Sequence, residues 1–121
     1  MANEITTTTQ LIFDDGEGGA FTLGGNSDIT SMGNAILIRQ KVSVGATEAA
    51  LPKGSVSTIG WAWFKNYSDT ATVTIRTTTG GTDFLKILPN AEQLIYIGTT
   101  MAPWVITSSG SVTLEYALFA A

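Results

Sequence analysis

The residues of this chain that could carry acid–base chemistry are ten carboxylates, because the sequence contains neither histidine nor cysteine. Without histidine there is no usual general base, no Ser-His-Asp arrangement and no imidazole metal ligand. Without cysteine there is no thiol catalysis, thiolate zinc site or disulfide. A glycosidase needs two carboxylates facing each other across a cleft, and nothing in the spacing pairs any two of them. We therefore expect no enzymatic activity, no catalytic residue and no cofactor.

One stretch concentrates carboxylates, the sequence D-D-G-E-G-G at Asp14 to Gly19. Three carboxylates beside three glycines suggest a calcium loop, but the acidic spacing and the distal glutamate of an EF-hand are missing. Glycine and aspartate also favour turns. The sequence therefore favours a solvated hairpin turn here, and we expect no bound metal.

The tryptophans are the remaining candidates for binding chemistry, and two of the three lie in the run from Ile59 to Ile75. Trp61 and Trp63 alternate with Ala62 and Phe64, which predicts a strand buried on both faces and packed by aromatic side chains. The alternative is an aromatic platform for a base or a sugar. Stacking platforms for nucleic acid usually accompany a basic groove, and none is visible, so the core strand is the favoured interpretation.

The composition argues against several classes of binding partner. The chain has 121 residues, a net charge of −4 and only 13% charged residues, about half the usual share. The six lysines and arginines are scattered, which argues against binding nucleic acid or an anionic membrane surface. The N-terminus resembles no signal peptide, and no apolar run is long enough to span a bilayer. A surface with so few charges suits a protein that packs against neighbours.

Period-two alternation of apolar and polar residues dominates the chain and predicts strands. We expect them at about 6–13, 20–23, 35–44, 61–67, 71–78, 82–88, 93–97, 104–107 and 111–119. Turn signals lie at Gly24–Asp28, Gly80–Gly81 and Pro89–Glu92, and Thr47–Leu51 could form one helical turn before Pro52. The pattern predicts an all-β protein: one antiparallel, jelly-roll-like β-sandwich of about eight strands over residues 1–121, with an N-terminal arm of about residues 1–5.

Four segments of the chain follow one another in a recognisable order. They are G-W-A-W-F-K-N-Y at Gly60–Tyr67, Val73–Ile75, F-L-K-I-L-P-N-A-E at Phe84–Glu92 and L-I-Y-I at Leu94–Ile97. Together they resemble a group of small β-rich proteins from tailed bacteriophages, whose members tend to carry G-W-A-x-F-x-N, then a V-x-I strand, then F-L-K-L before an acidic turn, then an apolar strand. The opening M-A-N-E-I-T is also similar, so the resemblance covers about residues 60–97 and the N-terminus.

The resemblance implies a virion structural protein, with a capsid decoration or cement protein as the first expectation. Such a protein is made in the host cytoplasm, sits on the outer capsid surface as a homo-oligomer, often a homotrimer, and bridges neighbouring copies of the major capsid protein. The alternatives are a tail or baseplate component, or a carbohydrate-binding sandwich that uses Trp61, Trp63 or Trp104.

Two segments are expected to contact a protein partner. The threonine-rich N-terminus could add a strand to a neighbour's sheet edge. Pro103 next to Trp104 marks either a contact surface or a lid over the end of the sandwich. The expected partner-binding residues are Asn3, Glu4, Ile5, Thr6, Thr7, Pro103 and Trp104.

Overall fold

The computed structural model describes residues 4–14, 16, 20–31 and 36–121, and it divides the chain into two compact units. The first unit is Met1–Gly33 and the second is Asn34–Ala121. All regular secondary structure in the described residues is β-strand, and every strand pairing is antiparallel. The expected all-β class is therefore confirmed.

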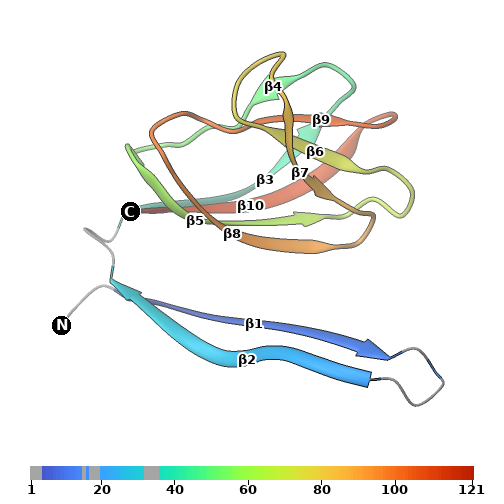
Figure 1. Cartoon of the computed structure of the whole chain (residues 1–121). Helices are drawn as coiled ribbons and strands as arrows, with labels where there is room; N and C mark the ends of the chain where they lie inside the picture. The colour runs from blue at the N-terminus through green and yellow to red at the C-terminus, as the bar shows by residue number, and fades with distance from the viewer. Residues whose placement is uncertain (1–3, 15, 17–19, 32–35) are drawn as a thin grey trace. The chain divides into compact units, whose positions relative to one another are not determined.

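The first unit is a long β-hairpin, hereafter the hairpin, formed by β1 (Glu4–Asp14) and β2 (Ala20–Ser31) (Figure 1). Its register runs from Glu4 opposite Ser31 to Asp14 opposite Ala20. The expected first strand is present and begins two residues earlier than predicted, because Glu4 and Ile5 already pair with β2. These two residues therefore belong to a strand and not to an arm, while residues 1–3 lie outside the described part of the chain.

The turn predicted at Gly24–Asp28 is wrong, because β2 continues through it. Gly24 and Gly25 have φ angles of 81° and 99°, and the register shifts between Thr8 and Gln10 on the opposite strand. A Cβ atom on Gly24 would lie 2.3 Å from the carbonyl oxygen of Thr9. The two glycines thus accommodate a β-bulge, in which positive φ and close backbone approach both favour glycine.

The second unit contains eight strands in two four-stranded sheets (Figure 1). The strands are β3 (Leu37–Val44), β4 (Ala49–Ala50), β5 (Ile59–Asn66), β6 (Val73–Arg76), β7 (Asp83–Ile87), β8 (Glu92–Thr99), β9 (Trp104–Thr107) and β10 (Val112–Ala120). The helical turn expected at Thr47–Leu51 is wrong, because Ala49 and Ala50 pair with Val105 and Trp104 in β4.

The sheet orders are β3-β10-β5-β8 and β4-β9-β6-β7. The first strand of this unit therefore pairs with the last, the second with the seventh, the third with the sixth and the fourth with the fifth. That pairing is one long antiparallel hairpin rolled into two sheets, which is the connectivity of a jelly roll. The predicted jelly roll with about eight strands is present, and it occupies Asn34–Ala121.

The core of the jelly roll follows the predicted alternation. On β5, Ala62 and Phe64 point inward and are fully buried, and so are Leu114, Tyr116 and Leu118 on β10. A buried phenylalanine or leucine contributes about 1.5–3 kcal/mol by leaving water. The adjacent strands β5 and β10 thus supply much of the apolar core of the jelly roll.

Polar groups inside the jelly roll are paired. The buried Asn66 amide donates to the carbonyls of Ala71 and Ile87, at 2.8 and 3.0 Å, and its Oδ1 accepts from the Ser68 amide. The Tyr116 hydroxyl donates to the Pro52 carbonyl at 2.6 Å. No buried side-chain polar atom among the described residues lacks a partner, as expected for a well-packed interior.

Candidate functional site

The N-terminal contact residues expected from the sequence lie in the hairpin, apart from Asn3, which is outside the described residues. Glu4, Ile5, Thr6 and Thr7 pair with residues 28–31 of β2. Within the described residues β1 pairs with β2 alone, so its second edge bonds to no other strand. These residues can still add to a neighbouring sheet, but as part of a preformed hairpin.

Pro103 and Trp104 lie in the other unit and differ from each other. Pro103 is buried, and its carbonyl accepts a 2.8 Å hydrogen bond from the Leu51 amide. Trp104 is partly exposed on β9, opposite Ala50 on β4 and Arg76 on β6. Of this pair, Trp104 is therefore the residue with more side-chain surface for a partner.

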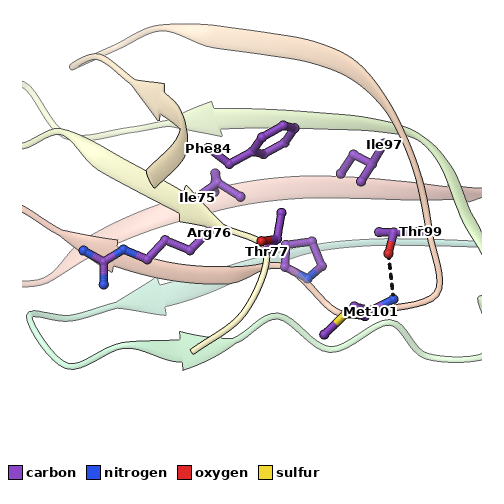
Figure 2. Close-up of a pocket in the computed structure, with 8 residues that line it drawn as sticks. Ile75, Arg76, Thr77, Phe84, Ile97, Thr99 and Met101 are labelled. Carbon is purple, nitrogen blue, oxygen red and sulfur yellow. Dashed lines mark hydrogen bonds between the residues drawn. The ribbon is translucent and has the colours of Figure 1, made fainter. Parts of the chain in front are cut away.

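A small apolar pocket lies where β6 ends and β7 begins, beside the end of β8 (Figure 2). Phe84, Ile97 and Met101 line it, and the Met101 amide donates to Thr99 Oγ1 at 3.1 Å. Its volume is about 10 Å³, room for about one water molecule. The pocket is too small for a cofactor or a sugar, so it is not the candidate site.

The candidate site is the outer face of the β3-β10-β5-β8 sheet. Two successive rows of this face are largely apolar, because the register places Leu37 beside Phe119, Ala117 beside Trp63, Trp63 beside Leu94, and Trp61 beside Tyr96. Leu37 and Tyr96 are about half exposed, and the rings of Trp61 and Tyr96 meet edge to face at 5.6 Å. We call this set the aromatic face: Leu37, Trp61, Trp63, Leu94, Tyr96, Ala117 and Phe119.

A hollow lies within the aromatic face, above the small side chain of Ala117. Arg39, Trp63, Ala117 and Phe119 line it, and its volume is about 270 Å³. Its lining is almost entirely apolar, since Arg39 turns its guanidinium toward Glu115 at 2.9 Å. A hollow of this kind suits a flat apolar group better than a charged one.

The next row of the same sheet carries charges of alternating sign. Across the four strands the register aligns Lys41, Glu115, Lys65 and Glu92, hereafter the charged row. Lys65 and Glu92 form an ion pair at 3.3 Å. The Lys41 ammonium lies 4.9 Å from the centroid of the Tyr67 ring. The row is thus a positive–negative–positive–negative sequence beside an apolar area.

Glu115 is the most strongly held charge in this row. The Tyr67 hydroxyl donates to its Oε1 at 2.6 Å, and the Arg39 guanidinium donates to its Oε2. The Tyr67 hydrogen bond first, and then the Arg39 contact, lower the pKa of the Glu115 carboxyl. The same hydrogen bond raises the pKa of Tyr67. With both oxygens occupied, Glu115 holds the sheet surface together and is poorly placed as an acid or base.

The expectation that Trp61 and Trp63 are buried as core residues is met only in part. Phe64 and Ala62 fill the interior, while both indoles lie on the outer face and are partly buried there. Alternation alone showed which residues share a face, but not that Tyr96, Leu37 and Phe119 gather beside the indoles. That clustering depends on the register of strands that are far apart in the sequence, from Leu37 on β3 to Phe119 on β10.

The described residues contain no group of three or more side chains suited to hold a metal ion. The predicted carboxylate-rich turn is only partly described, and there the Gly16 amide donates to Asp14 Oδ1 at 2.8 Å, as in a turn stabilised by aspartate. The described part of the chain includes no helix that could cross a membrane.

Comparisons with known proteins give little beyond this geometry. No protein-family model matches the chain, and no curated protein matches it. A solved chain from the disulfide-linked pili that form Bacillus endospore appendages aligns with 79% of this chain and 99% of its own length. The identity is 14% and the TM-score is 0.37, which is too distant to inform function.

Proposed function

We propose that this protein is a virion structural protein: a capsid decoration or cement protein that binds the outer shell and bridges neighbouring copies of the major capsid protein. The four segments that resemble proteins of tailed bacteriophages support a role in the capsid. The observation that carries a docking role is the hairpin, a long two-stranded element with exposed apolar side chains.

Among the described side chains of the hairpin, no apolar one is buried. Leu11, Ile12, Leu23 and Ile29 are each between 55% and 66% exposed, and Leu11 lies directly opposite Leu23. An isolated two-stranded hairpin is marginally stable in water, and exposed apolar groups on long open edges favour pairing with another chain. A neighbouring protein surface would supply the burial that the hairpin lacks.

Docking by such a hairpin suits a bridging protein. Its free edge can extend a sheet of a capsid subunit through main-chain hydrogen bonds, and several such contacts tied together in one oligomer add through effective concentration. A homotrimer is the form that the resemblance favours. The protein would then reside on the capsid surface and have no enzymatic role.

Binding to capsids that lack the protein tests the proposal directly. Purified wild-type protein should co-sediment with these capsids and raise their melting temperature. Leu11→Asp should weaken binding at least about tenfold, because it places a charge in the apolar contact. Leu88→Asp is the matched control, since Leu88 is a 59% exposed leucine of the jelly roll, and it should bind normally.

Failure of the wild-type protein to bind, together with capsids that are equally stable without it, would show the cement proposal to be wrong. A map of the intact virion with density for the protein at the tail or baseplate would replace it with a tail role.

A carbohydrate-binding module is the second candidate, and the partly exposed Trp61 and Trp63 on the aromatic face favour it. Flat apolar rings stack on the faces of sugars, and burying a ring in this way changes its fluorescence. Tryptophan emission measured with host-surface glycans separates the two functions. A saturable shift that Trp63→Ala abolishes would favour the lectin, and an unchanged spectrum would favour cement.

A further inference from the structure

We propose that the outer face of the β3-β10-β5-β8 sheet binds the same face of a second copy, through a twofold axis running close to the strand direction. This inference concerns the jelly roll alone and does not depend on the capsid proposal. It predicts a twofold contact for this face, whereas the resemblance favours a trimer.

The first argument for this pairing is the alternation of charge along the charged row. In such a dimer the two sheets stack face to face, and the twofold axis lies between them, along the strands. The axis reverses the order of the strands in the second copy, so β3 of one copy faces β8 of the other. Each row of residues faces the same row of the second copy. Lys41 then faces Glu92 of the second copy, and Glu115 faces Lys65 of the second copy, because the register order across the sheet is positive, negative, positive, negative. Each charge of the charged row meets an opposite charge, which favours this pairing over a random one. Lys41 with Glu92 is the stronger of the two contacts, because Glu115 is already bound by Arg39 and Tyr67.

The second argument is that large and small apolar residues of the two copies face each other. The same axis places the large Trp63 of one copy opposite the small Ala117 of the other, since these two residues are neighbours across the β5–β10 pair. The hollow above Ala117, about 270 Å³ in volume, is large enough for an indole ring. Two indoles would fill two hollows symmetrically, which is the self-complementarity that a twofold interface requires.

The geometry of stacked sheets sets the expected strength. Two sheets that pack face to face keep their strands within about 30°, so the axis lies within about 15° of the strands, and the long Lys41 and Glu92 side chains can cover the remaining offset. Four strands spaced by about 4.8 Å make a face about 20 Å wide. This is smaller than a standard stable interface, so we expect a dimer with a Kd of roughly 10 µM.

A charge-swap experiment on the full-length chain tests the pairing. Lys41→Glu gives two Glu–Glu contacts in a homodimer, and Glu92→Lys gives two Lys–Lys contacts. An equimolar mixture of the two variants restores both contacts as Glu–Lys pairs between unlike copies. Within one chain these two positions lie on opposite edges of the sheet, three strands apart, so a rescue by mixing reports a contact between chains.

Sedimentation velocity and light scattering across a concentration series supply the readout. We expect wild type to dimerise, each single variant to dimerise at least about tenfold more weakly, and the mixture to regain wild-type affinity. Trp63→Ala should give a monomer, whereas Trp104→Ala, on the outer face of the other sheet, should leave the dimer intact.

Three results would overturn the proposal. They are a wild-type chain that stays monomeric at 10-fold above the expected Kd, a trimer as the first oligomer, or a mixture no stronger than either single variant. Circular dichroism of each variant shows whether a loss of dimer reflects unfolding. If Trp63→Ala is unfolded, the charge-swap pair alone decides the outcome.

Discussion

The two units of this chain use similar strands for opposite purposes. In the jelly roll, inward residues such as Phe64 and Leu118 are fully buried. In the hairpin, Leu11 and Leu23 form a cross-strand pair in which each residue is more than half exposed. Alternating apolar residues therefore build a core only where a second sheet covers them, and elsewhere they form a surface for a partner.

Charge separates the two units as clearly as burial does. Residues 1–33 contain five of the ten acidic residues and none of the six basic ones, so the second unit has five acidic and six basic residues. The whole-chain charge of −4 therefore combines a strongly acidic hairpin with a nearly neutral jelly roll. Acidic charge on an element with exposed apolar groups keeps it soluble until a partner covers it.

Hydrogen exchange should show the largest difference between the units. Amides of β5 and β10 open only with the whole jelly roll, and a folded domain of this size is stable by about 5 kcal/mol or more. Amides of β1 and β2 belong to a marginal element. We expect hairpin amides in the free protein to exchange at least about a thousandfold faster. Equal protection of β1 and β5 in the free protein would contradict the comparison.

Two matched truncations should give a smaller but clear contrast. Phe64→Ala removes a fully buried ring and should lower the free energy of unfolding by about 3–5 kcal/mol. Leu11→Ala removes a side chain that is 58% exposed and should change it by less than about 0.5 kcal/mol. Denaturant unfolding followed by tryptophan fluorescence measures both. A large loss from Leu11→Ala would mean that the hairpin is part of the folding core.

Period-two alternation was enough to predict the all-β class, most strands and the jelly roll, because burial on one side repeats at every second residue. It could not separate the hairpin from the sandwich, because an apolar residue recurs at every second position around Leu11 in the hairpin and around Val42 in the sandwich. It also misread Gly24 and Gly25, because a bulge and a turn both favour glycine. The aromatic face was missed because its rows form across strands, where Trp61 meets Tyr96, and register depends on the whole fold.

The smallest expected effect concerns how the turn between β6 and β7 is held in the jelly roll. Glu48 accepts hydrogen bonds of 2.6 Å from Thr79 Oγ1 and the Gly80 amide at one oxygen, and from Arg76 at the other. The Thr79 hydrogen bond first, then Arg76 and Gly80, lower the pKa of the Glu48 carboxyl. A carboxyl whose folded pKa is lowered stabilises the protein above its unfolded pKa, and this stability is lost as pH falls through the folded value.

We therefore expect Glu48→Gln to be less stable than wild type at pH 7, because glutamine is neutral and has one accepting oxygen where the carboxylate has two, so it loses the ion pair with Arg76. The difference should shrink below about pH 4, where protonation of Glu48 makes wild type resemble the variant. Thermal unfolding at a series of pH values measures it. Glu92→Gln loses a single exposed ion pair and should follow the wild-type curve. A gap between wild type and Glu48→Gln that stayed constant down to pH 2 would show that the turn depends on the shape of the side chain and not on its charge.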